Sequence, residues 1–127
     1  MANTKNAISW FEIPVDDYDR AKKFYEGILD AEFGEMDIDG TKLAMFPADE
    51  GQDAVGGALI ASPDVKPSEQ GSVVYIDANP DLQIVLNRIE SAGKSVFIPK
   101  TQVGPDMGFF AQFKDSEGNR VGLYSMA

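Results

Sequence analysis

The sequence predicts an α+β fold built from two copies of a βαβββ module within one domain of 127 residues. Two observations support this prediction: a strand followed by an amphipathic helix occurs near the start and again halfway along the chain, and three further strand-like segments follow each pair. A stretch with prolines and mixed charges, residues 62–70, lies between the two halves. We therefore expect module one at about 6–61, a linker at 62–70 and module two at about 71–126.

The first module opens with a strand over residues 8–13 that ends at Pro14, because proline cannot donate a hydrogen bond to a sheet. Asp16 or Asp17 is expected to cap the following helix. Apolar residues in that helix recur at i, i+3, i+4 and i+7 and so share one face: Ala21, Phe24, Tyr25 and Ile28. Strands are expected at 32–38, 41–46 and 55–60, with a hairpin turn at 39–40 and an acidic loop at 47–53.

The second module repeats this order. A strand at 72–76 precedes Asn79, which is expected to cap a helix with Pro80 at its first position. The same apolar spacing recurs in this helix, at Leu82, Val85, Leu86 and Ile89. Gly93 is expected to end the helix. Strands are then predicted at 95–98, 108–113 and 120–124, with a loop at 99–108 and a turn at 115–119.

Composition excludes several functions. The chain has 21 acidic and 11 basic residues, a net charge of -10, so nucleic acid and anionic membranes are not expected partners. The charge is expected to keep the surface soluble, or else to steer a cationic ligand. No residue is Cys or His, which excludes thiolate nucleophiles, disulfides and imidazole bases. The N-terminal segment has no apolar signal region and no apolar run could span a membrane, so a cytoplasmic location is expected.

Two motifs resemble a known family. The first is Pro-Val-Asp-Asp-Tyr-Asp-Arg-Ala-Lys-Lys-Phe-Tyr with its preceding strand, residues 8–25. The second is Phe-Lys-Asp-Ser-Glu-Gly-Asn-Arg-Val-Gly-Leu-Tyr at 113–124, in which Ser116 replaces the usual Pro of the family's turn. Together they resemble the vicinal oxygen chelate superfamily, which includes glyoxalase I, bleomycin-resistance proteins and extradiol dioxygenases. The resemblance implies two βαβββ modules that pair into curled mixed sheets around a cavity. It also implies a homodimer.

The resemblance also indicates where metal ligands would lie, and this chain lacks them. The His or Gln position of the first strand falls at Trp10, and the second module's position falls at Gly71 or Ser72. The two late-strand carboxylate positions fall near Gly57 or Ala58 and at Gly122. None can supply an imidazole or a side-chain carboxylate, so we expect no metal and no other cofactor.

Six residues are predicted to line the cavity: Trp10, Glu12, Tyr75, Phe110, Arg120 and Tyr124. Trp10 would form a stacking wall, or else fill the core. Glu12 is a weak candidate for a general acid or base, or for an anchor of a cation, and could instead pair with Arg120 or be solvated. Arg120 could hold an anion, or form a salt bridge with Asp115 or Glu117.

Phe110 has two possible roles, which it shares with neighbouring apolar residues. Together with Phe109 and Met107 it could form an apolar lid over the cavity, or these residues could belong to the core.

These residues support a metal-free protein that binds a small molecule between its modules; whether it catalyses a reaction stays open. One alternative is a metal-dependent lyase or isomerase related to lactoylglutathione lyase, with Glu12 among its ligands. Another is an antibiotic-sequestering resistance protein, in which Trp10 stacks on a cationic aromatic drug.

Overall fold

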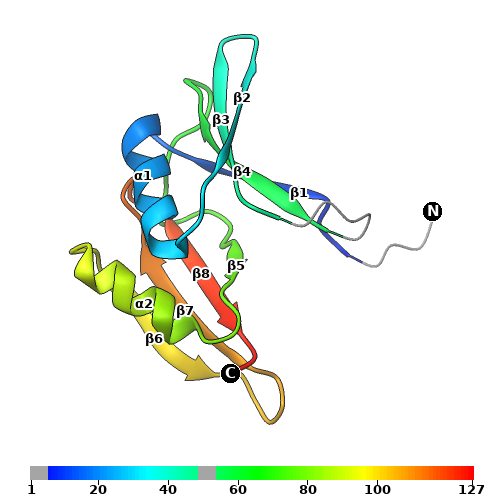
Figure 1. The fold of residues 1–127 in the computed structure, drawn as a ribbon, viewed down its shortest axis with the longest axis vertical. Coiled ribbons are helices and arrows are strands. Elements are labelled where there is room, and N and C mark those ends of the chain that lie inside the picture. Colours follow the sequence, from blue (N-terminus) through cyan, green and yellow to red (C-terminus); the bar gives the residue numbers. More distant parts are fainter. Residues whose placement is uncertain (1–5, 49–53) are drawn as a thin grey trace.

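The computed structural model describes residues 6–48 and 54–127, and its helices and strands follow the predicted order (Figure 1). Residues 49–53, most of the predicted acidic loop, lie outside the described residues. Module one contains β1 (Trp10–Pro14), α1 (Tyr18–Leu29), β2 (Gly34–Ile38), β3 (Thr41–Met45) and β4 (Gly56–Ala61). Module two contains β5 (Tyr75–Asp77), α2 (Leu82–Ser91), β6 (Val96–Gln102), β7 (Phe109–Lys114) and β8 (Arg120–Ser125).

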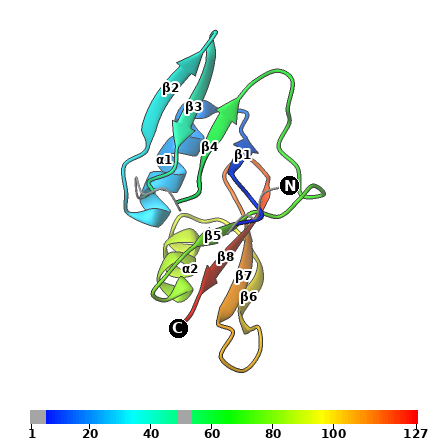
Figure 2. The ribbon, with the colours of Figure 1, turned by 90° about the vertical axis from the view of Figure 1, so that its right-hand side faces the viewer.

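Each module forms its own four-stranded sheet with the same topology. Sheet one has the order β1-β4-β3-β2 and sheet two has the order β5-β8-β7-β6. In both sheets the first strand runs parallel to the last, and the remaining pairs are antiparallel. The predicted α+β class and the repeated βαβββ order are therefore confirmed. Figure 2 shows module one above module two.

The helices form where the apolar spacing predicts them. Asp17 caps α1, since its Oδ1 accepts a hydrogen bond from the Arg20 N–H at 3.0 Å. Ala21, Tyr25 and Ile28 are buried, as are all four apolar positions of the α2 stripe. The described residues contain no helix long and apolar enough to cross a membrane.

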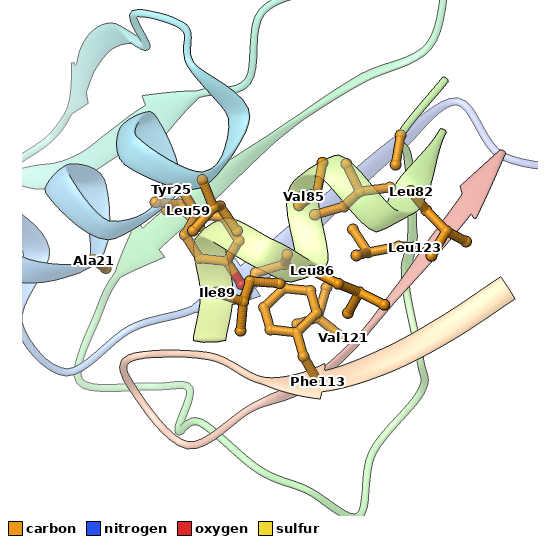
Figure 3. Packing of buried hydrophobic residues seen from close by; sticks show 14 of the residues in the cluster. Ala21, Tyr25, Leu59, Leu82, Val85, Leu86, Ile89, Phe113, Val121 and Leu123 are labelled. Atoms are coloured by element: carbon orange, nitrogen blue, oxygen red, sulfur yellow. The ribbon is translucent and has the colours of Figure 1, made fainter. Parts of the chain in front are cut away.

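The core lies between the helices and the sheets and is continuous across the two modules (Figure 3). Tyr25 of α1 and Phe113 of β7 are fully buried, and their ring centroids lie 6.5 Å apart. Ile89 of α2 is also fully buried, and α1 packs directly against α2. Burying a side chain such as Phe113 contributes about 1.5–3 kcal/mol. The two modules are therefore joined through their helix sides.

The turn between β7 and β8, residues 115–119, makes a second connection between the modules. The Tyr25 hydroxyl donates to Asp115 Oδ2 at 2.7 Å, and Asn119 Nδ2 donates to the Pro14 carbonyl at 2.8 Å. Glu117 accepts hydrogen bonds from the Asp17 N–H at 2.7 Å and from Arg20 Nε at 2.8 Å. Side chains from module two thus bind the start of α1 in module one.

Three local predictions differ from the structure. The strand predicted at 72–76 is confined to Tyr75–Asp77. The cap of α2 is Asp81 and not Asn79, because Pro80 precedes the helix and Asp81 Oδ1 accepts from the Gln83 N–H at 2.9 Å. The predicted loop from Pro99 is partly strand, since β6 continues to Gln102. β6 is an edge strand with register shifts on both sides of Ile98, and an edge or a bulge is where a sheet accepts proline. The hairpin at residues 39–40 forms as predicted, with positive φ at both positions.

Candidate ligand-binding site

Each sheet has one face covered by its helix and one open face. On β1, Ile13 is buried against the core while Trp10 is 44% exposed on the opposite face. On β5, Ile76 is buried while Tyr75 is 46% exposed. β1 and β5 are the edge strands of their sheets, so the exposed aromatic residues of both modules lie at sheet edges. Successive side chains of a strand point to opposite faces of the sheet, which separates the buried residues from the exposed ones.

A cavity of about 590 Å³ lies where these two edges approach each other. Its walls come from both modules, and Trp10 and Tyr75 are among the lining residues. Phe11, Phe46 and Val73 add apolar surface, and Asp77 is the charged lining residue. The volume lies within the range of about 300–1,000 Å³ that small-molecule sites occupy. Of the six residues predicted to line a cavity between the modules, Trp10 and Tyr75 line this one, whereas Glu12, Phe110, Arg120 and Tyr124 do not.

Trp10 is positioned by glycine on the neighbouring strand. It pairs with Gly56 of β4, and a Cβ atom at Gly56 would lie 3.3 Å from the indole ring. The indole Nε1 donates a hydrogen bond to Glu12 Oε2 at 3.3 Å. The ring therefore lies along the open face of sheet one and presents aromatic surface to the cavity.

Tyr75 lies flat over sheet two for a similar reason. It pairs with Gly122 of β8, where an added Cβ would lie only 2.3 Å from Tyr75 Cδ1. Its ring reaches β7, where Gln112 Nε2 donates to the Tyr75 hydroxyl oxygen at 2.7 Å. The ring of Phe110 lies 6.3 Å from that of Tyr75 at an interplanar angle of 69°, an edge-on contact.

Arg120 belongs to the same network. Its Nη1 donates to Gln112 Oε1 at 2.9 Å, and its guanidinium lies over the Phe97 ring at 4.1 Å from the centroid. Its Nε donates to the Glu69 carbonyl at 3.4 Å. Within the described residues Arg120 makes no ion pair with Asp115 or with Glu117. The structure thus brings Tyr75, Phe110 and Arg120 together.

Glu12 and Tyr124 take other positions. Glu12 is exposed and lines a small hollow of about 50 Å³, which Arg120 also lines, yet its hydrogen bond is to Trp10. The Tyr124 hydroxyl donates to the Met107 carbonyl at 2.6 Å, so it holds the β6–β7 loop and does not line the large cavity. Met107 itself is exposed, and Phe109 packs against the core.

Sequence reasoning missed Gln112 and Phe97. Gln112 is a polar residue on the same face of β7 as Phe110, between two apolar neighbours, and this interruption of an apolar strand was the available signal. Phe97 lies next to a register shift of β6, which an alternation pattern does not reveal.

The backbone pairing also fixes the positions at which relatives would place a metal. Val15 donates its N–H to the Ile60 carbonyl, and Ala78 donates to the Tyr124 carbonyl, so these two residues are equivalent in the two modules. Counting back from them places Val73, and not Gly71 or Ser72, in the position of Trp10.

The same pairing makes Ala58 equivalent to Gly122. The residues at the four positions, Trp10, Val73, Ala58 and Gly122, offer no imidazole or carboxylate, so they do not fit a metal ion. Across residues 6–48 and 54–127 no group of three or more acidic, His or Cys side chains could hold one.

Comparison with known proteins gives a consistent result. The sequence model of the glyoxalase/bleomycin resistance protein/dioxygenase superfamily matches residues 7–123. No curated protein sequence matches the chain.

Several solved structures share the fold. TnmS3, an antibiotic binding protein from Streptomyces sp. CB03234, is 22% identical with a TM-score of 0.67, over 99% of this chain and 100% of its own. A glyoxalase/bleomycin resistance protein from the same strain is 24% identical with a TM-score of 0.63, over 91% of this chain and 97% of its own. The fosfomycin resistance protein FosX from Listeria monocytogenes is 14% identical with a TM-score of 0.68, over 98% of this chain and 94% of its own. With the family match covering nearly the whole chain, the protein belongs to the glyoxalase/bleomycin resistance protein/dioxygenase superfamily.

Proposed function

We propose that this protein binds a planar aromatic small molecule in the cavity between its modules, without a metal ion. The observation that carries the proposal is that Trp10 and Tyr75, one from each module, line the same mainly apolar cavity of about 590 Å³. A planar ligand between two exposed aromatic side chains gains stacking contact from both, and such contacts add about 0.5–1.5 kcal/mol each beyond area burial. The cytoplasmic location expected from the sequence belongs to this proposal.

Binding is favoured over metal-dependent lyase or isomerase chemistry. The alternative needs three or four ligands that converge on one ion. Trp10, Ala58, Val73 and Gly122 occupy the positions where relatives would place them, and none offers a suitable donor atom. Glu12 lies on the same face of β1 as Trp10, and its carboxylate accepts a hydrogen bond from the Trp10 indole. We propose no catalytic role for Glu12.

Antibiotic sequestration is the biological use that one comparison favours. TnmS3, which shares the fold over the whole chain, is named an antibiotic binding protein. A protein that only binds its drug needs an aromatic cavity and no reactive group, which is what the described residues offer here. Titration with a panel of ligands would identify which antibiotic the protein binds.

The test is a binding titration with planar aromatic compounds, including anthraquinone and naphthoquinone antibiotics, by calorimetry. We expect saturable one-site binding that weakens about tenfold or more in Trp10→Ala, because the variant removes one stacking wall. Ile84→Ala is the matched control, since Ile84 is also an exposed apolar residue but lies on α2 outside the cavity. Equal affinity of the Trp10→Ala variant and the wild type would refute the proposed site.

We also propose that the protein is a homodimer whose contact includes the open face of sheet one. Met36 and Ile38 of β2 are 45% and 52% exposed, and the strand register places them on the same face as Trp10. Exposed apolar residues that cluster on a sheet face mark interaction surfaces. Sedimentation equilibrium should give a dimer mass for the wild type and a monomer mass for Met36→Lys/Ile38→Lys. A monomeric wild type would contradict this.

A further inference from the structure

Three side chains connected by hydrogen bonds on the open face of sheet two determine which donor hydrogens remain available to a ligand. Gln112 of β7 lies between Tyr75 of β5 and Arg120 of β8 and bonds to both, at 2.7 Å and 2.9 Å. Arginine has only donors, so the atom of Gln112 that faces Arg120 must be the amide oxygen. The amide NH₂ group of Gln112 must then face Tyr75.

This orientation makes Tyr75 a donor on the open face of sheet two. The Tyr75 oxygen already accepts the Gln112 hydrogen bond, so its own O–H hydrogen points away from Gln112. No described residue accepts that hydrogen in the structure. Tyr75 is half exposed and lines the large cavity, and its hydroxyl lies beside Gln112 of β7 on the open face of sheet two, so a ligand that extends from the cavity over this face can accept the hydrogen.

Arg120 supplies further donors beside this one. Its Nε and Nη1 donate to the Glu69 carbonyl and to Gln112, and Phe97 supports one face of the guanidinium. The described residues accept no hydrogen bond from its Nη2. Arg120 lines the small hollow of about 50 Å³, and Ser72 and Val74 line both this hollow and the large cavity.

Two carboxylates lie near these donors: Asp77 lines the large cavity, and Glu12 lines the same small hollow as Arg120. Glu12 accepts from the Trp10 indole, and Asp77 Oδ1 accepts from the backbone N–H and the side-chain amide of Asn79. The site therefore offers two kinds of directed donor, a neutral hydroxyl and a guanidinium, next to aromatic walls. A cationic drug, which the overall charge of -10 would attract, does not match this arrangement of donors.

We infer that the ligand extends from this cavity over the open face of sheet two and carries an anionic oxygen, a carboxylate or an enolate, on its aromatic ring, and that Tyr75 and Arg120 bind that oxygen. Gln112 is a positioning residue that sets both groups as donors. The inference rests on the proposed function, because it names the ligand class of the same cavity. Ionised acceptors form the shorter and stronger hydrogen bonds with arginine, so this group determines specificity.

Three probes of the same shape test the inference by calorimetry: 2-naphthoate, 2-naphthamide and 2-naphthylmethylammonium. In the wild type, 2-naphthoate should bind at least tenfold more tightly than the ammonium compound, with the amide between them. Tyr75→Phe keeps the ring and removes the donor, so the affinity for 2-naphthoate should fall about three- to tenfold.

Gln112→Glu supplies the decisive comparison. A carboxylate at this position accepts from both Arg120 and Tyr75, so the tyrosine hydrogen and the positive charge are no longer offered to the ligand. The ratio of the 2-naphthoate affinity to the ammonium affinity should fall at least tenfold, a change that general destabilisation does not produce. Gln83→Glu is the matched control, because Gln83 lies on α2 and bonds to Asn87.

The outcomes separate this inference from the proposed function. If all three probes bind equally, or if Gln112→Glu leaves the affinity ratio unchanged, the cavity binds aromatic compounds but the anionic specificity is refuted. If none of the probes binds, both the aromatic site and its specificity are refuted. A tighter wild-type affinity for the ammonium compound than for 2-naphthoate would reverse the inference.

Discussion

Replacing Glu117 with Gln should weaken the connection between the two modules. The Glu117 side chain is fully buried and accepts hydrogen bonds from the backbone N–H groups of Asp16 and Asp17 at the start of α1. It also accepts from Arg20 Nε and Nη2 at 2.8 Å and 3.0 Å, and from the Ser116 hydroxyl at 2.9 Å. All of its partners are donors, which suits a carboxylate at a helix N-terminus.

The size of the effect follows from the pKa of Glu117. Burial alone would raise this pKa, but the Arg20 guanidinium, the Asp17 N–H and the Ser116 hydroxyl lower it from 4.5 to about 2. One pKa unit corresponds to about 1.4 kcal/mol, so the ionised carboxylate stabilises the fold by about 3 kcal/mol. Glutamine cannot provide this, because its NH₂ group would face another donor whichever way the amide is turned.

The pH dependence has a defined sign. The pKa of Glu117 is lower in the folded protein than in the unfolded chain, so its stabilisation is complete above the unfolded value of about 4.5. Protonation removes this stabilisation as the pH falls from 4.5 toward 2. The free-energy difference between wild type and Glu117→Gln should therefore shrink through that window.

Urea denaturation at several pH values measures this difference directly. We expect Glu117→Gln to lose about 3 kcal/mol of unfolding free energy at pH 7 and far less near pH 2. Glu90→Gln is the matched control, because Glu90 is exposed on α2, and it should change stability by less than about 0.5 kcal/mol. A loss below about 1 kcal/mol at pH 7, or a loss that stays constant down to pH 2, would refute the reasoning.

Two further substitutions test the geometry. Gly122→Ala places a Cβ 2.3 Å from the Tyr75 ring, which is exposed enough to move outward. The affinity for 2-naphthoate should then fall at least tenfold, while the free energy of unfolding falls by about 1 kcal/mol. Gly27→Ala is the control, because Gly27 is an exposed helix position with open space around it, and its free energy of unfolding should rise by about 0.5–1 kcal/mol. Tyr25→Phe removes a buried donor to Asp115 and should cost about 1–3 kcal/mol in urea denaturation; an unchanged unfolding midpoint would contradict that hydrogen bond.

Much of the fold follows from local sequence patterns. The apolar spacing in α1 and α2 depends on helix geometry alone, and Tyr25 and Ile89 of those stripes are fully buried as predicted. The hairpin at Asp39-Gly40 depends only on residues that tolerate positive φ, and it forms. Each of these features needs no knowledge of distant parts of the chain, which is why the sequence predicts them.

The candidate site was harder to predict because its geometry depends on partners far apart in the sequence. Alternation places Tyr75, Arg120 and Tyr124 on one sheet face, but it does not show that the Tyr124 hydroxyl turns to the Met107 carbonyl. The role of Arg20 was missed for the same reason, since Glu117 lies 97 residues away from it. A pattern in one strand does not specify which side chain from another strand will reach it.

The cavity and the 115–119 turn are linked by the way the modules join. Within the described residues no strand of sheet one packs against a strand of sheet two, and the modules meet through α1, α2 and the contacts of this turn. Trp10 and Tyr75 belong to different sheets but line one cavity, so the distance between them depends on how the modules are held. We therefore expect Glu117→Gln to weaken binding of the proposed aromatic ligand although Glu117 does not line the cavity, because its contacts help to fix the relative position of the two aromatic walls.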